Sequence, residues 1–118
     1  MFLFTFRSRI NPKSKEANRL KDVGGAYVNC WINFKDYDAS EKLAKLLIKE
    51  QGWIPEKNSA ESKIEKKSLR KKKAKQYYAE AMKYGYSLVF DTWPKDAPDA
   101  GEDYETERRA GGGRQKGV

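Results

Sequence analysis

The chain has 118 residues, a length that suits one domain, and it carries a formal net charge of +8 with one cysteine and no histidine. A single cysteine excludes an intrachain disulfide. The lack of histidine removes the commonest general base and the commonest zinc ligand, and we expect no metal and no cofactor. No stretch approaches the ~20 consecutive apolar residues of a membrane span, and the first residues lack the features of a signal peptide. We therefore expect a cytoplasmic protein that contacts no membrane.

The first segments predict a strand and then a polar connection. Residues 2–9 alternate, with three phenylalanines on one side, which predicts a strand with an aromatic inner face. Proline cannot donate a backbone hydrogen bond to a neighbouring strand, so Pro12 ends this strand. Residues 13–22 are polar and predict a loop with room for a helical turn.

Residues 26–34 show the cleanest period-two pattern in the sequence and predict the strand around which the domain is organised. Successive side chains of a strand point to opposite faces, so one face is apolar and the other carries aromatic rings and amides. The apolar face predicts a core, whereas the contacts of the other face are the functional question. The apolar face consists of Ala26, Val28, Cys30, Ile32 and Phe34, and the other face of Tyr27, Asn29, Trp31 and Asn33.

A leucine-rich helix follows, and Asp38 with Glu41 predicts its N-terminal cap. Gly52 predicts its end, since glycine tolerates the left-handed conformation found there. The next two residues predict a short strand, which Pro55 places at a sheet edge or cuts short. Strand, helix and strand with short joins form a βαβ unit, so we expect these two strands to be parallel. A weak further strand is predicted at 62–66.

The second half of the chain predicts a helix over about 68–84, ended by Gly85, and a last strand over 86–93 that Pro94 stops. Residues 95–118 hold almost no large apolar side chains, and they include three consecutive glycines. A segment of this composition cannot repay the entropy lost on ordering, so it predicts a disordered tail.

The order of these elements predicts an α+β fold, with residues 1–94 as one domain and 95–118 as the tail. From residue 26 onward it approximates the two-layer, ferredoxin-like split βαβ arrangement, with the strand at 2–9 as an extra N-terminal strand. In that arrangement both helices cover one face of the sheet. The other face is then open, or a partner covers it.

Three motifs carry a resemblance to a known group of proteins. They are Ala-Tyr-Val-Asn-Cys-Trp-Ile at 26–32, the leucine-rich helix that ends in Gly52-Trp53, and Gly85 followed by Phe90-Asp91-Thr92-Trp93-Pro94. Over residues 25–94 the chain resembles a group of small uncharacterised bacterial α+β proteins. The resemblance implies a bacterial, cytosolic setting. It implies no activity and transfers no functional residue, because none is known for the group.

The helix-free face of the sheet is the first candidate site. If the strands share one sheet, this face collects aromatic rings, which can stack on bases, and polar groups, which can hydrogen-bond base edges. Exposed aromatic residues are also enriched in protein interfaces, so a dimer or partner contact is one alternative, and coverage by the chain's own loop or tail is another. The predicted site residues are Arg7, Tyr27, Asn29, Trp31, Asn33, Asp91 and Trp93.

The second candidate site is the basic segment at 63–75, which holds eight basic residues and one acidic residue and so carries a local charge of +7. A row of cations can neutralise phosphates and release counterions, which predicts salt-dependent binding of nucleic acid or another polyanion. The alternative is a solvated helix start that serves solubility. Cations oppose the positive end of the helix dipole, and this cost favours a functional reason. The predicted polyanion-binding residues are Lys66, Lys67, Arg70, Lys71, Lys72, Lys73 and Lys75.

The sequence contains no catalytic constellation, so we do not expect an enzyme. Cys30 lies on the apolar face, and the carboxylates of Asp36 and Asp38 suit turn and cap chemistry. We expect a non-enzymatic binding module that uses the aromatic and amide face together with the basic segment, with nucleic acid as the leading specific partner. The alternative is a protein-interaction or regulatory module, either a homodimer or an adaptor, in which the lysines serve solubility alone.

Overall fold

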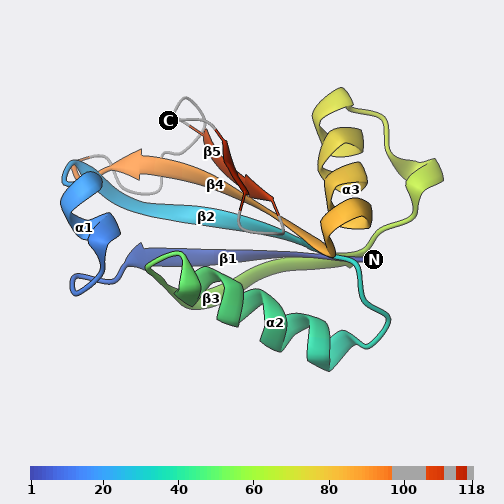
Figure 1. Cartoon of the computed structure of the whole chain (residues 1–118), viewed down its shortest axis with the longest axis horizontal. Coiled ribbons are helices and arrows are strands. Elements are labelled where there is room, and N and C mark those ends of the chain that lie inside the picture. Colours follow the sequence, from blue (N-terminus) through green and yellow to red (C-terminus); the bar gives the residue numbers. More distant parts are fainter. Residues whose placement is uncertain (97–105, 111–113, 117–118) are drawn as a thin grey trace.

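The protein is an α+β fold built on one antiparallel sheet, as the sequence predicts. The computed structural model describes residues 1–96 and the backbone of residues 106–110 and 114–116 (Figure 1). Within these residues, the strand order is β3-β1-β2-β4-β5-β6. The strands are β1 (Phe2–Ile10), β2 (Val23–Ile32), β3 (Trp53–Lys63), β4 (Tyr86–Pro94), β5 (Thr106–Ala110) and β6 (Arg114–Lys116). The helices are α1 (Lys15–Arg19), α2 (Tyr37–Glu50) and α3 (Lys72–Tyr84), with a 3-10 turn, η1, at Lys66–Ser68.

β1 lies inside this sheet rather than at its margin. It pairs antiparallel with β2 on one side and with β3 on the other, so β2 and β3 are parallel with β1 between them. The predicted ferredoxin-like topology with an extra N-terminal strand is therefore not confirmed, because the strand order differs. An inner position suits β1, since Phe4 and Phe6 are fully buried when strands flank them on both sides.

The helices α2 and α3 cover opposite faces of the sheet (Figure 1). Buried residues of α2 pack with the even-numbered residues of β2, whereas α3 packs with Trp31 and Val89 on the other face. The prediction of two helices on one face is therefore wrong. Both faces carry large apolar side chains, so both need a helical cover to remove that surface from water.

The main core lies between the sheet and α2, and it confirms the alternation predicted for 26–34 as far as Ile32. Cys30 is fully buried there, and desolvation by burial raises the pKa of its thiol. Phe34 was expected on the same apolar face, but it lies beyond the end of β2 and is exposed. The core consists of Phe4, Phe6, Ala26, Val28, Cys30, Ile32, Ala44, Leu47, Ile48, Trp53, Leu88 and Phe90.

β3 is longer than the sequence predicts. The predicted short strand after Gly52 and the first two residues of the weak strand predicted at 62–66 belong to one strand of 11 residues. Pro55 does not end this strand, because β3 is the outermost strand on its side of the sheet, where proline is tolerated. Two register shifts against β1 accommodate the irregular pairing.

The glycines predicted to end the long helices have the expected conformation, but the predicted N-cap is wrong. Gly52 and Gly85 have φ angles of +88° and +95°. The helix α2 begins after Asp36, whose carboxylate accepts a hydrogen bond from the Ala39 amide at 2.7 Å, so Asp36 replaces Asp38 as the cap. An N-cap residue has an extended rather than a helical backbone, and Asp36 is the residue before α2 with that conformation.

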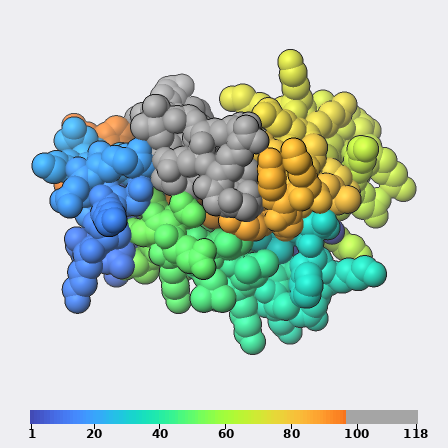
Figure 2. Space-filling view, in the orientation of Figure 1, coloured from blue at the N-terminus to red at the C-terminus, as the bar shows by residue number. Residues whose placement is uncertain are grey.

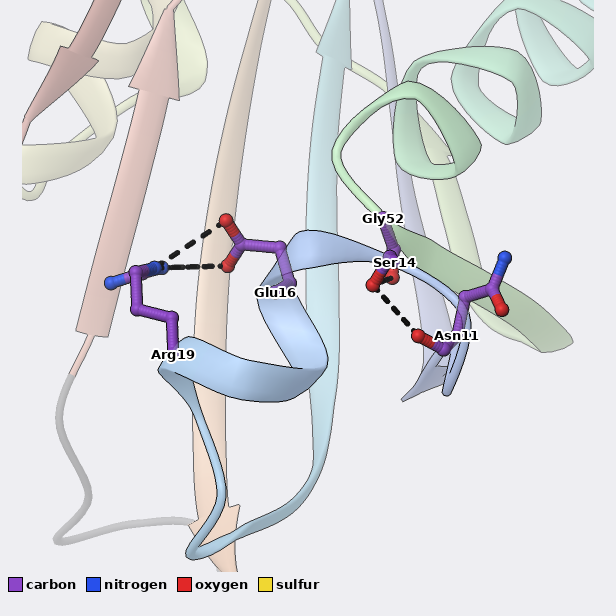
Figure 3. A network of polar contacts seen from close by, with 5 residues as sticks. All are labelled: Asn11, Ser14, Glu16, Arg19 and Gly52. Carbon is purple, nitrogen blue, oxygen red and sulfur yellow. Dashed lines mark hydrogen bonds and ion pairs between the residues drawn. The ribbon is translucent and has the colours of Figure 1, made fainter.

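The short helix α1 occupies part of the predicted loop and is tied to the turn between α2 and β3 (Figure 3). The Ser14 hydroxyl lies 2.7 Å from the Asn11 carbonyl oxygen and 3.0 Å from the Gly52 carbonyl oxygen. Within α1, Arg19 forms an ion pair with Glu16 at 2.7 Å. The hydroxyl contacts join two distant segments of sequence and fix the end of the molecule opposite α3.

The predicted tail contains two strands where the composition predicts disorder. β5 pairs antiparallel with β4, and β6 pairs with β5. Backbone pairing along a free strand edge needs no large apolar side chain, which is why composition does not reveal it. Residues 97–105, 111–113 and 117–118 lie outside the described residues, and for them the predicted disorder stays a prediction.

Candidate functional site

The helix α3 buries one end of the sheet face that the sequence predicted to be open. Trp31 is 5% exposed and Val89 is 3% exposed, and both pack with Ala81 of α3. The Trp31 ring lies 6.1 Å from the Tyr77 ring, centroid to centroid, at an interplanar angle of 50°. Of the three alternatives for this face, coverage by the chain itself applies here, although the cover is a helix rather than a loop or tail.

The second tryptophan of this face is also buried. Trp93 is 3% exposed and lies 5.1 Å from the Tyr27 ring, with the Arg7 guanidinium over its own ring at 5.2 Å. Gly25 makes room for it, because a Cβ at that position would lie 2.5 Å from a ring carbon of Trp93. The two tryptophans therefore form no open stacking platform. Asn33 lies beyond the end of β2 and is exposed, so it is not part of this face.

A row of polar side chains crosses the three strands between the two tryptophans. The Thr5 hydroxyl donates to Asn29 Oδ1 at 2.7 Å, and Asn29 Nδ2 donates to Asp91 Oδ2 at 3.0 Å. All three side chains are half-buried. Because each strand is held by its neighbours, these hydrogen bonds fix the Asp91 carboxylate on a rigid surface.

A pocket of about 270 Å³ lies between this row and the start of α3, and it joins the two sites that the sequence predicted separately. The sheet contributes Asn29, Trp31 and Asp91, and the basic segment contributes Lys71 and Lys73. We call it the sheet-side pocket. Its lining residues are Leu3, Asn29, Trp31, Lys71, Lys73, Ala74, Tyr77, Val89 and Asp91.

A larger groove of about 1020 Å³ runs along the outer side of α3 and the segment before it. Five of its lining residues are cations, the other four are apolar or aromatic, and no described carboxylate lines it. This end of the molecule lies apart from α1, as the yellow region of Figure 2 shows. We call it the outer groove. Its lining residues are Lys66, Lys67, Leu69, Arg70, Lys75, Tyr78, Ala79, Met82 and Lys83.

The start of α3 lacks the stabilising features found at the start of α2. Its N-cap residue is Lys71, which provides no side-chain hydrogen bond to the helix, and its first turn contains no acidic residue. The helix begins at Lys72, later than the predicted residue 68, and η1 precedes it. This start places Lys72, Lys73 and Lys75 in the first turn, where cations oppose the helix dipole. The same lysines concentrate positive charge between the sheet-side pocket and the outer groove.

The sequence prediction missed the apolar part of both cavities. Tyr78 and Met82 were named for no predicted site, yet both line the outer groove, where Met82 is 54% exposed. Lys83 was outside the predicted basic segment, although it lies two helical turns after Lys75 on the same side of α3. The helical spacing of Lys75, Tyr78, Met82 and Lys83 was the available signal.

Comparisons of the chain with protein-family models, with curated proteins and with solved structures gave no match. The resemblance carried by the sequence motifs therefore stays a prediction. The described part of the chain contains no group of three or more residues arranged to hold a metal ion. In the same part of the chain, every helix is too short or too polar to cross a bilayer. The two cavities beside α3 are the features from which a function can be argued.

Proposed function

We propose that this protein is a non-enzymatic binding module that holds single-stranded nucleic acid in the outer groove. The observation that carries the proposal is the lining of the groove, where five cations surround apolar side chains and the described lining includes no carboxylate. Glu65, which forms an exposed ion pair with Lys67 at 3.6 Å, is outside this lining. Apart from Lys83, these cations belong to the segment 63–75, whose local charge of +7 nearly equals the formal net charge of the whole chain. A charge concentrated in this way favours an extended anionic partner.

The cations of the outer groove suit a phosphate backbone. Four of them are exposed, so a phosphate can reach each one from solvent: Lys66, Lys67, Arg70 and Lys75. A single strand that engages all five cations would lose affinity with salt at a logarithmic slope of about −3 to −4. That slope corresponds to about a 100-fold loss of affinity between 50 and 200 mM salt.

The apolar residues of the groove favour a single strand over a duplex. Leu69, Tyr78 and Met82 lie among the cations, where unpaired bases could pack on them while the backbone follows the charges. In a duplex the bases are stacked on one another, so only phosphates would reach the groove. We therefore expect a labelled single-stranded oligonucleotide to bind more tightly than a duplex of the same length.

Fluorescence anisotropy with a labelled oligothymidine of about 12 nucleotides tests the proposal, a length within the site sizes of such proteins. The double variant Lys66→Glu with Arg70→Glu should lower the affinity at least tenfold. The matched control is Lys42→Glu with Lys49→Glu on α2, which changes the net charge equally at exposed positions. The control should lower the affinity much less. No binding at low salt, or equal losses in the two double variants, would contradict a binding site in the outer groove.

The alternative predicted from the sequence, a homodimer or adaptor that binds through the sheet face, stays a prediction. Its basis has changed, because Trp31 and Trp93 are buried. The exposed large apolar side chains include Phe34 and Leu46, which are 53% and 57% exposed and lie before and within α2. Light scattering over a concentration series tests the homodimer directly, and a monomer at every concentration would exclude it.

A further inference from the structure

We infer that Arg70 selects guanine among the bases of the strand held in the outer groove. The inference deepens the proposed function and rests on it, because it concerns which base of that strand is read. It is carried by how the Arg70 guanidinium is held, by which of its donors stay free and by the apolar side chains beside it. Its test compares oligonucleotides with one another, so it can fail while binding to the groove stands.

The Arg70 guanidinium is held by the backbone of the segment that precedes α3. Its Nη1 donates to the Lys67 carbonyl oxygen at 2.9 Å and, more weakly, to the Leu69 carbonyl oxygen at 3.4 Å. Lys67 belongs to η1, whose turn is closed by two backbone hydrogen bonds of 3.0 and 3.1 Å. The planar group is therefore oriented before a ligand arrives, and less side-chain entropy is lost for each hydrogen bond that it forms.

The other edge of this guanidinium carries two parallel donors, Nε–H and one N–H of Nη2. In the part of the chain that the structure describes, the hydrogen bonds of Arg70 are the two that Nη1 donates, and the side chain is exposed. A ligand can therefore meet both free donors at once if it offers two acceptors side by side in one plane.

Guanine offers such a pair of acceptors. Its O6 and N7 are neighbours on one edge, and arginine meets both of them in the commonest specific contact with this base. At the same edge adenine presents a donor beside an acceptor, and thymine presents one acceptor beside a methyl group. Cytosine is the nearest competitor, because O2 and N3 are neighbouring acceptors on its pairing edge. Its single ring covers less apolar surface than the two rings of guanine, so guanine is favoured.

A phosphate also offers two acceptors, and two observations favour a base for the Arg70 fork. The described lining of the outer groove includes four lysines besides Arg70, and these flexible point charges suit the phosphates of a backbone. Leu69 directly precedes Arg70, and Met82, which is 54% exposed, lines the same groove. Bases that pack on these apolar side chains present their edges beside the fork, while the lysines follow the backbone.

Fluorescence anisotropy at low salt tests the inference with the labelled oligothymidine and with versions whose two central bases are guanine, cytosine or adenine. We expect the guanine version to bind more tightly than each of the others by roughly fivefold or more. Hypoxanthine keeps O6 and N7 but lacks the N2 amino group, so it should bind as tightly as guanine. 7-Deazaguanine lacks the N7 acceptor, so most of the preference should be lost.

Three variants of the full chain separate the reading of a base from the attraction of phosphates. Arg70→Lys keeps the charge but lacks the fork, so it should remove the preference for guanine. Lys75→Gln should weaken the guanine and thymine oligonucleotides by the same factor, as expected for a phosphate contact, and so leave the preference intact. The control Lys49→Arg, an exposed change on α2 outside the groove, should change neither affinity.

Equal affinities for the guanine and thymine oligonucleotides, equal affinities for guanine and cytosine, or a preference that survives Arg70→Lys would overturn the inference. If Arg70→Lys weakens every oligonucleotide by the same factor, Arg70 holds a phosphate, so the guanine assignment falls and the outer groove stands. If no oligonucleotide binds at low salt, the proposed function is wrong and the inference falls with it.

Discussion

The two faces of the sheet differ in what their side chains are used for. On the α2 side, twelve buried residues, three of them from α2 itself, form one continuous apolar core. Against α3 the buried cluster contains three residues, and beside it are a polar row, a pocket and a cationic groove. The difference shows that one face supplies most of the apolar burial that stabilises the domain, which leaves the other face free to carry polar and charged groups at little cost to the fold.

The β-strand β2 contributes side chains to both faces of the sheet. The even-numbered residues of β2 are buried against α2, and its odd-numbered residues include Asn29 and Trp31 of the sheet-side pocket. A site on such a strand is held by a backbone that the opposite core has already fixed. The following variants test this division, from the largest expected effect to the smallest.

Phe90→Ala should have the largest effect, because it removes a fully buried ring from the core against α2. We expect a loss of about 3–5 kcal/mol in the free energy of unfolding, measured by urea denaturation. Val89→Ala, on the opposite face, should lose about 1–2 kcal/mol, because the change removes two buried methyl groups. Equal losses in the two variants would show that the faces do not differ in this way.

Gly25→Ala should lower the free energy of unfolding by about 1–3 kcal/mol, because the new Cβ overlaps the buried Trp93 ring. The strand conformation itself tolerates alanine, so the loss measures crowding alone. Combining this change with Trp93→Ala should cost less than the sum of the two single changes, since the ring that clashes is gone. Strictly additive losses in urea denaturation would mean that the new Cβ is crowded by a group other than the Trp93 ring.

Lys71→Asp should stabilise the protein and weaken its binding at the same time. An aspartate at the N-cap can accept a backbone hydrogen bond, and we expect a gain of about 0.5–2 kcal/mol in thermal or urea unfolding. The reversed charge should also lower oligonucleotide affinity, because residue 71 directly follows Arg70 of the outer groove. The reference is Asp36→Ala at the start of α2, which should cost about 1 kcal/mol and leave binding unchanged. If Lys71→Asp lowered the free energy of unfolding, the lysine at this N-cap would not weaken the helix, and the expected trade between helix capping and binding would be wrong.

The smallest effect concerns Tyr37, whose hydroxyl donates to the Glu61 carboxylate at the surface. This hydrogen bond, with smaller contributions from desolvation and nearby carboxylates, raises the pKa of Tyr37 to about 12. Because the folded-state pKa lies above the ordinary value of 10, the bond contributes fully below pH 10 and is lost as the pH rises through about 12. Spectrophotometric titration should show Tyr37 ionising late, and Glu61→Gln should move its ionisation to lower pH. An unchanged titration would exclude the bond.

Local signals predicted most of the secondary structure. The alternation in β2, the presence of the helix α2 and the left-handed glycines at 52 and 85 depend on neighbouring residues, and the structure has each of them. The leucines of α2 did not reveal its buried side, because Leu43 and Leu46 are exposed. The position of β1 and the full length of β3 depend on pairing between distant segments, which no local pattern encodes. The face covered by α3 was missed for the same reason, since its apolar stripe fits either side of a sheet.

The candidate site was predictable in its parts and not in its assembly. Asn29, Trp31 and Asp91 were named from strand alternation, and Lys71 and Lys73 from the density of charge. Their meeting in one pocket depends on α3 lying over the odd-numbered face, which the sequence did not reveal. Tyr77 was missed as a lining residue because an apolar side chain acquires that role only when a cavity forms beside it.

The inner position of β1 has a consequence for biosynthesis. The ribosome releases this strand before β3, and β3 is complete only when Lys63 has been made. During that interval three phenylalanines and one row of backbone amides are available to other nascent chains, so early contact with a chaperone should improve the yield. The Met1 carbonyl also accepts a hydrogen bond from the Ile64 amide. A purification tag placed before Met1 would therefore start beside the end of β3 and should reduce recovery.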